Sequence, residues 1–428
     1  MTVTKAERTG WYFYDWANSA FYTTVITVFL GPYLTSITKS AADSSGYVQV
    51  IGIPVYADSL FAYTVSLSVA LQVIILPLFG AIADTTNYKK TILGISAYIG
   101  AIATTLMFFL EGTRFLLGSI LFIIANISFG VSVIIYNSYL NEIAEPENRD
   151  KISANGWAFG YLGGGILLAL NLLLFSQKDK LGITTDYAVR ICLCSAGLWW
   201  GIFTIIPLLT LKNRKQNGIK ALSGNIVYSG FRQLFKTIRD ARKYPVTLLF
   251  LLSFIFYNEG IQTIIVISSL FGHEELGIPF STLTQIILMV QFIAFLGSLF
   301  YKFVLRYLSV KNTIIISLFI WLSIIVYTYR FLTGTTDFFI LAACIALVLG
   351  GTQAMSRSFF SNMIPLGYEA EYFSLYEISD RGTSWLGPLI FGLSLQLTGS
   401  YRYAMLSLGV FIAIGLALLF KVKESELK

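Results

Sequence analysis

The acidic residue with the clearest chemical meaning in this sequence is Glu259, in the middle of a long apolar stretch. The stretch Val246–Phe271 has the length of a membrane-spanning helix, and Glu259 lies about fourteen residues into it. A charge at that depth costs roughly 2.5–3.5 kcal/mol unless it faces a cavity or takes up a proton. Asn258 and Gly260 adjoin Glu259, and Gln262 shares its helical face. We expect a proton-titrating or substrate-binding carboxyl; a structural carboxyl bonded to a neighbouring helix is the alternative.

A second acid, Asp15, lies near the start of the first apolar stretch, Trp11–Ile37. Asn18 is three positions further along on the same helical face, so the two side chains could line the entrance to a cavity. Asp15 is only four residues after Trp11, and a negative charge near a helix N-terminus is also favourable for structural reasons alone. A place on the solute or proton pathway and an interfacial structural role therefore both stay open for Asp15.

Other site chemistries have little support in this sequence. It contains three cysteines and one histidine with no C-x-x-C pair, so we expect neither a zinc site nor a Cys/His nucleophile pair. No G-x-x-x-x-G-K-[ST] phosphate loop occurs. We therefore expect no metal, no cofactor and no ATP hydrolysis by this chain alone.

The elements that must position these side chains are transmembrane helices. Of the 428 residues, 56% are hydrophobic and only 12% are charged, compared with roughly 25% charged in soluble domains. Twelve stretches have the length and apolarity of a membrane span: Trp11–Ile37, Ser59–Ala83, Thr91–Leu110, Phe115–Leu140, Ser153–Phe175, Tyr187–Leu211, Val246–Phe271, Thr282–Leu305, Lys311–Leu332, Asp337–Phe360, Tyr376–Leu397 and Tyr401–Phe420. We expect an all-α integral membrane protein of twelve transmembrane helices.

One long basic connection divides the twelve spans into two sets of six. We expect an N-terminal six-helix bundle over 1–211, a basic cytoplasmic linker over 212–245 and a C-terminal six-helix bundle over 246–428. Phe13-Tyr14-Asp15 in the first span is similar to Phe256-Tyr257-Asn258 in the seventh. Parallel repeats of this kind are typical of transporters in which two pseudo-symmetric bundles rock against each other.

The distribution of basic residues predicts the orientation in the membrane. An even number of spans places both termini on one side, and that side holds 23 of the 30 Lys and Arg residues. The positive-inside rule therefore predicts that both termini are cytoplasmic, in the cell membrane. The same bias accounts for the net charge of +7 without a nucleic-acid partner.

The connection between the second and third spans, GAIADTTNYKK, covers residues 80–90. It resembles the signature loop between helices 2 and 3 of the major facilitator superfamily, matching it at Gly80, Asp84, Lys89 and Lys90. The resemblance implies close helix packing at the glycine and a charge-relay contact from Asp84 to the other bundle. This chain has Thr and Asn at two positions where the family usually has a basic residue and a glycine, and a solvated loop acid is the alternative.

Three further segments make the resemblance to the major facilitator superfamily more specific. They are YDWANSAF at 14–21, YNEGIQT at 257–263, and GGTQAMSRS at 350–358 followed by EYFSLYE at 371–377. Together they are similar to a bacterial branch of the superfamily, once called an unknown major facilitator family, which is related to the fungal autophagy-associated vacuolar amino-acid effluxer. The resemblance implies transport, a chain that works as a monomer, and amino acids as the solutes of the fungal relatives.

Arg357 lies near the cytoplasmic end of the tenth predicted span. It could form a gate with Glu377 or Asp380, near the start of the eleventh predicted span. Alternatively, an arginine is favoured there by the helix dipole and by the positive-inside rule.

Glycine is concentrated in the fifth predicted span, at Gly156, Gly160, Gly163, Gly164 and Gly165. Small residues at this spacing let two helix backbones approach closely, so we expect a packing role.

These observations predict a secondary transporter that moves a small polar solute by alternating access, coupled to protons, with amino acids as the class suggested by the resemblance. Its expected partners are that solute, protons and the lipid bilayer. A non-transporting membrane scaffold or sensor and a membrane-embedded enzyme are the alternatives, although no cluster of catalytic groups is evident in the sequence apart from His273-Glu274-Glu275 on the outer side.

Overall fold

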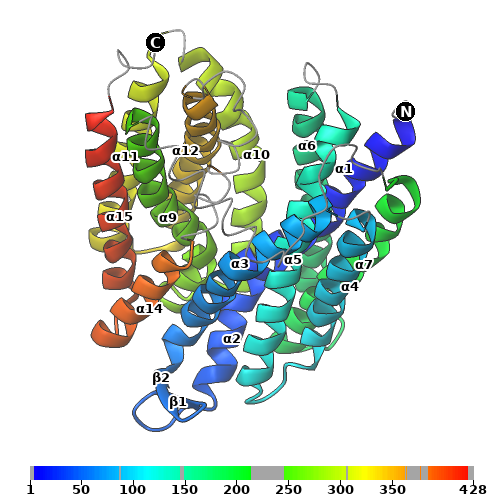
Figure 1. The fold of residues 1–428 in the computed structure, drawn as a ribbon. Coiled ribbons are helices and arrows are strands. Elements are labelled where there is room, and N and C mark those ends of the chain that lie inside the picture. The colour runs from blue at the N-terminus through cyan, green and yellow to red at the C-terminus, as the bar shows by residue number, and fades with distance from the viewer. Residues whose placement is uncertain are drawn as a thin grey trace. The chain divides into compact units, whose positions relative to one another are not determined.

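The chain forms two compact helical units, Met1–Phe231 and Arg232–Lys428 (Figure 1). The structure is a computed structural model, and it describes residues 4–85, 88–144, 149–213, 245–304, 307–361, 363, 376 and 384–422. Most of the predicted linker, and Glu377 and Asp380 of the predicted gate, lie outside these ranges.

The N-terminal unit contains six membrane-length helical segments and one small hairpin. Its elements are α1 (Lys5–Ala20), the π-helix η1 (Phe21–Phe29), α2 (Leu30–Lys39), β1 (Tyr47–Val50), β2 (Ile53–Tyr56), the 3-10 helix η2 (Ala57–Ser59), α3 (Leu60–Thr85), α4 (Lys89–Leu106), the 3-10 helix η3 (Met107–Phe109), α5 (Phe115–Ile143), α6 (Arg149–Gln177) and α7 (Thr185–Thr210).

All regular elements in the described part of the C-terminal unit are helices. Its elements are α9 (Pro245–Glu274), α10 (Phe280–Val304), α11 (Val310–Arg330), α12 (Thr335–Ser361), α14 (Leu386–Thr398) and α15 (Tyr401–Lys421). The predicted eleventh span, Tyr376–Leu397, contains α14, which begins at Leu386 with Trp385 as its N-cap residue.

Each predicted membrane span corresponds to a helix in the described residues. Eight helices are long and apolar enough to cross a membrane, and four shorter apolar helices occupy the positions of the remaining predicted spans. The prediction of an all-α membrane protein is therefore confirmed, and the helix ends differ from the predicted ends by a few residues in most cases.

The first span begins at Lys5, six residues before the predicted start at Trp11. Thr4 and Glu7 form a reciprocal capping box, in which each side chain bonds to the other residue's backbone N–H. The helix then continues through the π-helical segment η1 to Lys39. Asp15 consequently lies ten residues, or about 15 Å, beyond the helix start.

A two-stranded antiparallel hairpin follows α2 and was not expected from the sequence. Tyr47 pairs with Tyr56, and the turn residues Ile51 and Gly52 both have positive φ, as a tight hairpin turn requires. Lys39 at the end of α2 forms a 2.7 Å ion pair with Asp58 after the second strand. The hairpin therefore closes the connection between the first two membrane helices.

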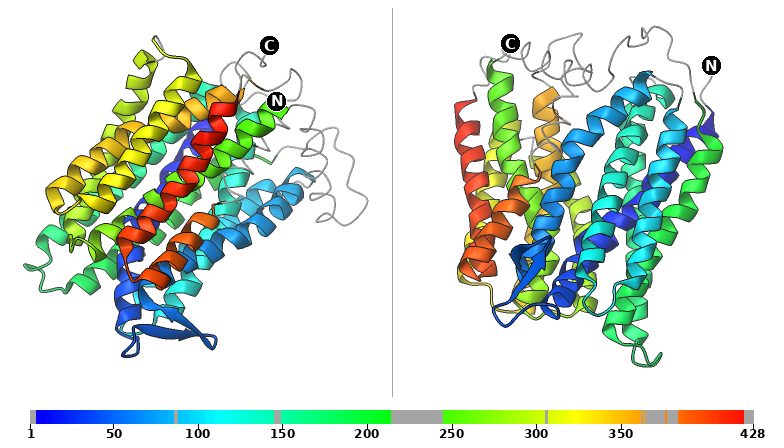
Figure 2. Two further views of the ribbon diagram at one scale, coloured as in Figure 1. Left: turned by 90° about the vertical axis from the view of Figure 1, so that its left-hand side faces the viewer. Right: turned by 60° about the horizontal axis from the view of Figure 1, so that its bottom comes forward.

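The two units share four corresponding helix pairs in their internal packing. In the N-terminal unit α1 packs on α7, α3 on α5, α4 on α5 and α4 on α7. The equivalent helices of the C-terminal unit, in chain order, make the equivalent pairs: α9 with α15, α10 with α12, α11 with α12 and α11 with α15. Figure 2 shows the helices of each unit running alongside one another. This shared scheme confirms the two pseudo-symmetric bundles predicted from the sequence.

The glycines of α6 allow close contact with the first helix, as predicted. A Cβ atom added at Gly163 would lie 2.5 Å from the backbone oxygen of Trp16, and one at Gly164 would lie 2.9 Å from Oγ1 of Thr23. A side chain at either position would therefore push the helices apart. Gly165 is different, because a Cβ atom there would meet nothing within 4 Å.

Candidate functional site

The C-terminal unit buries three consecutive polar residues of α9. The exposed fractions of Tyr257, Asn258 and Glu259 are 1%, 1% and 2%. A buried carboxyl needs hydrogen-bond partners or a proton, since transfer of an isolated charge out of water costs far more than the surrounding packing can supply. Helix α14 supplies a partner for the Glu259 carboxyl, and α12 supplies partners for Tyr257 and Asn258.

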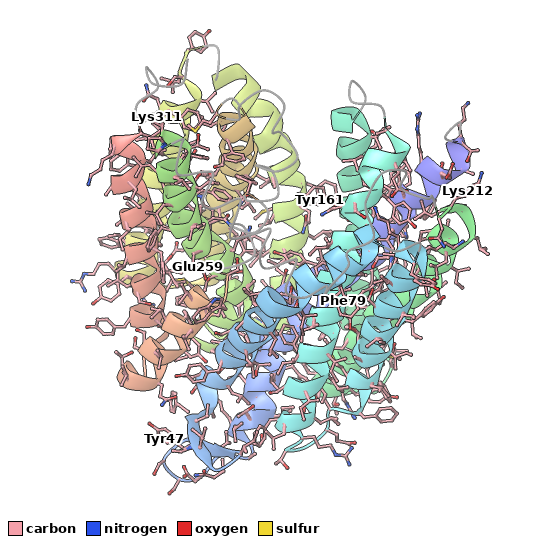
Figure 3. The ribbon with its side chains drawn as sticks, viewed as in Figure 1. Tyr47, Phe79, Tyr161, Lys212, Glu259 and Lys311 are labelled. Atoms are coloured by element: carbon pink, nitrogen blue, oxygen red, sulfur yellow. The ribbon has the colours of Figure 1, made fainter. Side chains whose placement is uncertain are left out.

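Glu259 caps the N-terminus of α14. Its Oε1 accepts a 2.5 Å hydrogen bond from the backbone N–H of Gly387, the second residue of that helix. The N–H groups of a first helical turn have no partner within the helix, and the helix dipole favours a negative charge there. Pro388, the next residue, has no N–H to offer. Figure 3 marks Glu259 inside the C-terminal unit.

Gly387 permits this contact because α9 and α14 approach each other very closely. A Cβ atom at Gly387 would overlap Oγ1 of Thr263 and would lie 2.9 Å from Oε1 of Glu259. Thr263 is buried one turn after Glu259, and its hydroxyl donates to the Glu259 carbonyl. Any side chain at Gly387 would therefore displace α14 from the carboxylate.

Asn258 and Tyr257 join α9 to α12. Nε2 of Gln353 donates a 2.9 Å hydrogen bond to Oδ1 of Asn258, and the hydroxyls of Tyr257 and Ser356 lie 2.6 Å apart. Gln353 and Ser356 were not singled out as site residues from the sequence. Their i, i+3 spacing in a span otherwise rich in apolar residues is the signal that could have found them.

Gln262, the remaining residue predicted for this site, is half-buried on α9. The described site therefore combines a carboxyl, side-chain amides and hydroxyl groups of α9 and α12 with a backbone N–H of α14. Such a set can accept and release a proton and can hydrogen-bond a polar molecule.

The N-terminal unit places Asp15 against α5 and α6. A Cβ atom at Gly160 would lie 3.1 Å from the carboxyl carbon of Asp15, and the hydroxyl of Tyr136 faces the same carboxyl. Tyr136 is held in place by Trp11, which stacks on its ring at 4.4 Å and donates to its backbone oxygen. Asp15 therefore packs against α5 and α6 and lies ten residues after the helix start, beyond the first turn of the helix.

Asn18 lies deeper in the same unit and is 3% exposed. It is close to the hydroxyl of Tyr14, which also faces Ser132 of α5 and Trp200 of α7. Asp15 and Asn18 thus contact different neighbours, although they share one helical face in the sequence.

The predicted gate residues are described only in part. Lys89 forms a 2.8 Å ion pair with Glu142 of α5, and both side chains are largely buried. This pair joins α4 to α5 inside the N-terminal unit. The backbone N–H of Lys90 donates to Oδ1 of Asn213. The surroundings of Gly80 and the side chains of Asp84 and Arg357 lie outside the described part of the structure.

Metal binding has no support in the described residues, among which no group of three or more His, Cys, Asp and Glu side chains could hold an ion.

Comparison with known proteins identifies relatives along almost the whole chain. A family model described as "Vacuole effluxer Atg22 like" matches residues 3–427. An uncharacterized MFS-type transporter, YxiO of Bacillus subtilis (strain 168), is 31% identical over 423 residues, which cover 98% of this chain and 95% of the relative. Autophagy-related protein 22 of Coccidioides immitis (strain RS) is 27% identical, over 96% of this chain and 85% of the relative.

Solved structures give the same fold. A crystal structure of the nucleoside transporter NupG matches with a TM-score of 0.67 and 15% identity, covering 97% of this chain and 98% of the other. At this level of identity the likeness establishes the arrangement of helices only.

Proposed function

Because this chain belongs to the family of vacuole effluxers like Atg22 and is a multi-pass membrane transporter of the major facilitator type, we propose that it moves a small polar solute by alternating access, coupled to proton binding at Glu259. The family match agrees with the resemblance seen in the sequence motifs, and the relatives are transporters rather than enzymes.

The observation that carries the proposal is the hydrogen bond between Glu259 and Gly387. A carboxyl that gains a proton loses its charge, becomes a weaker acceptor and no longer complements the helix dipole. Protonation of Glu259 therefore weakens its hold on the N-terminus of α14. Binding of one proton therefore changes the free energy of one helix arrangement relative to another. Such a change is what the coupling of proton binding to alternating access requires.

The polar groups beside Glu259 suit a small solute with both donors and acceptors. Asn258, Gln262 and Gln353 present amide groups, which both donate and accept hydrogen bonds. An amino acid has matching groups and is our proposed solute class, in keeping with the family. Asp15 and Asn18 of the N-terminal unit are the proposed continuation of the pathway.

The remaining parts of the proposal concern the gate and the topology. Asp84, with Lys89 and Lys90 beside it, and Arg357 with Glu377 or Asp380, would stabilise one state of the transport cycle. The chain would act as a monomer in the cytoplasmic membrane with both termini in the cytoplasm, as the basic residues predict. A proton gradient would contribute about 2.3 kcal/mol per charge for each 100 mV of membrane potential.

A screen in proteoliposomes tests the proposal. The purified chain is reconstituted with a pH-sensitive dye inside, and amino acids, peptides, sugars and organic acids are added one class at a time. We expect one class, amino acids, to cause a pH change that Glu259→Gln abolishes. Asp179→Asn, which alters a highly exposed acid, is the matched control and should behave like the wild type.

A purely structural role for Glu259 is the second candidate, and the cap on α14 is the observation that favours it. Two variants separate the candidates. Glu259→Gln keeps an oxygen that can accept from Gly387 but cannot titrate, whereas Glu259→Ala removes both properties. Normal coupled transport by Glu259→Gln would show that the carboxyl serves only as a cap, and a folded wild-type chain that moves no solute would favour a scaffold or sensor.

A further inference from the structure

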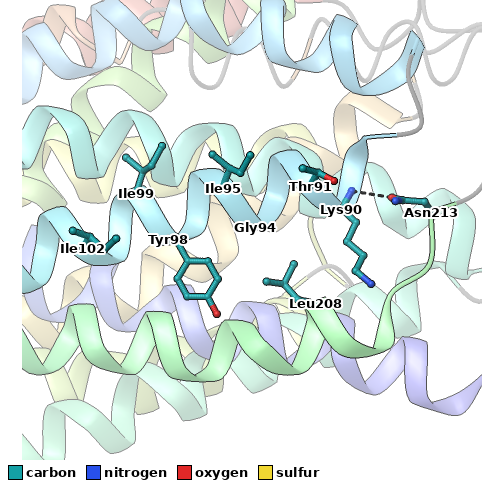
Figure 4. A pocket seen from close by; sticks show the side chains of 9 residues that line it. All are labelled: Lys90, Thr91, Gly94, Ile95, Tyr98, Ile99, Ile102, Leu208 and Asn213. Carbon is teal, nitrogen blue, oxygen red and sulfur yellow. Dashed lines mark hydrogen bonds between the residues drawn. The ribbon is translucent and has the colours of Figure 1, made fainter.

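A long apolar groove runs along the outer surface of the N-terminal unit between α4 and α7. It consists of two adjoining hollows, of about 550 and about 350 Å³, which share Tyr98 and Ile102. Figure 4 shows the larger hollow, with Lys90 and Asn213 at one end and apolar side chains along the rest. The groove therefore has one polar end and an apolar body.

The body of the groove matches a hydrocarbon chain in size and chemistry. From Lys90 to Leu106 it follows α4 for about 24 Å, more than half of the roughly 30 Å hydrocarbon core of a bilayer. Ile95 and Ile99 on its wall are 58% and 46% exposed. Gly201 leaves its floor open, since a Cβ atom there would make only ordinary contact with Ala101 at 3.5 Å.

The polar end of the groove carries a lysine ammonium with no carboxylate or carbonyl partner among the described residues. Lys89, its neighbour, is instead paired with Glu142. Oδ1 of Asn213 accepts from the Lys90 backbone N–H at 3.1 Å, so the amide NH₂ of Asn213 remains available as a donor. Lys212, next to Asn213, is exposed and adds a second positive charge.

The equivalent lysine of the C-terminal unit is used differently. Lys311 is the second residue of α11, as Lys90 is the second residue of α4. The ammonium of Lys311 donates to the backbone oxygens of Val422 and Phe420 at the end of α15, at 2.5 and 3.4 Å. Lys311 therefore binds a helix end in the C-terminal unit, whereas the equivalent Lys90 lies at the polar end of the groove in the N-terminal unit.

We propose that this groove binds one phospholipid with an anionic headgroup. One of its acyl chains lies between α4 and α7, and its phosphate accepts from the ammonium of Lys90 and the amide of Asn213. Basic residues at a membrane surface attract anionic lipids, and a basic site beside an apolar groove selects them over zwitterionic ones.

Native mass spectrometry of the full-length chain in detergent tests this proposal by titration with dioleoyl phosphatidylglycerol or dioleoyl phosphatidylcholine. We expect one phosphatidylglycerol molecule to bind more tightly than phosphatidylcholine. Lys90→Ala should weaken that binding about fivefold, the effect of one lysine near a lipid surface. Lys5→Ala, at an exposed lysine that begins α1, is the matched control and should change it little.

Gly201→Leu tests the acyl chain separately, because it fills the groove without a close contact to the backbone. It should lower phosphatidylglycerol binding several-fold while leaving Lys90 in place. Equal binding of both lipids would overturn the proposal, as would equal effects of Lys90→Ala and Lys5→Ala. Competition by millimolar inorganic phosphate, with no effect of Gly201→Leu, would identify a simple anion site and also overturn it.

Discussion

The carboxylate of Glu259 in α9 accepts a hydrogen bond from the backbone N–H of Gly387 at the start of α14. This single contact joins a buried acid to the end of a helix that begins inside a predicted membrane span. Its strength depends on whether the carboxyl carries a charge, so different substitutions of Glu259 separate the structural contribution of this contact from its proton-binding one.

Glu259→Ala should destabilise the protein, because it leaves the N–H of Gly387 buried without its acceptor. The cost of such an unpaired group is about 1–3 kcal/mol. Glu259→Gln should cost less, since its amide oxygen can still accept from Gly387. Thermal unfolding in detergent measures both variants, and equal melting temperatures for the two would contradict the cap.

Gly387→Ala should be strongly destabilising, because the added methyl would overlap Thr263. Overpacking of this kind typically costs about 1–3 kcal/mol. Gly387→Ala combined with Thr263→Ala should recover part of the loss, since the closest overlap is with the Thr263 hydroxyl. Gly165→Ala, made where nothing lies within 4 Å, is the control and should leave the melting temperature almost unchanged.

Arg402 at the start of α15 ties three segments of the C-terminal unit together. It pairs with Glu275 at 2.5 Å and donates to the backbone oxygens of Tyr329 and Leu332. Arg402→Ala should lower stability by about 1–3 kcal/mol, and Arg402→Lys should recover only part of this because lysine lacks the planar fork. Arg114→Ala is the matched control, since Arg114 is exposed with one long 3.4 Å bond; a similar loss for both would contradict this role.

Lys89 and Lys90 should respond differently to the same substitution. Lys89→Ala removes the ammonium that pairs with the largely buried Glu142 and should cost roughly 3 kcal/mol. Lys90→Ala removes an ammonium with no protein partner in the described residues and should change stability by less than about 0.5 kcal/mol. Chemical denaturation of the two variants measures the difference, and equal stabilities would show that the Lys89 pair contributes little.

The helices were predictable from the sequence because a membrane span must be long and apolar, a constraint that leaves few alternatives. The twelve apolar stretches therefore correspond to helices. The start of the first helix was misplaced since its cap depends on Thr4 and Glu7, in a polar segment that apolarity does not detect. The hairpin at Tyr47–Tyr56 was missed because its turn has Ile51, a residue uncommon at positive φ.

The site was predictable in part. A lone acid in an apolar span drew attention to Glu259, and the structure finds it buried beside Gly387 and Thr263. Its partner could not be inferred, because a backbone N–H leaves no mark in the sequence and Gly387 lies 128 residues away. The neighbours of Asp15 were equally hidden, since they depend on which face of α1 meets Tyr136 and Gly160.

Comparing solute exchange with solute accumulation in Glu259→Gln proteoliposomes tests whether transport is coupled to protons through Glu259. Exchange of labelled for unlabelled solute needs no net proton movement, whereas accumulation against a gradient does. If Glu259 carries the coupled proton, Glu259→Gln retains exchange but loses accumulation driven by an imposed pH gradient, while Asp179→Asn retains both. Accumulation by Glu259→Gln at the wild-type level would contradict proton coupling through Glu259 and leave this residue with its structural role at the start of α14.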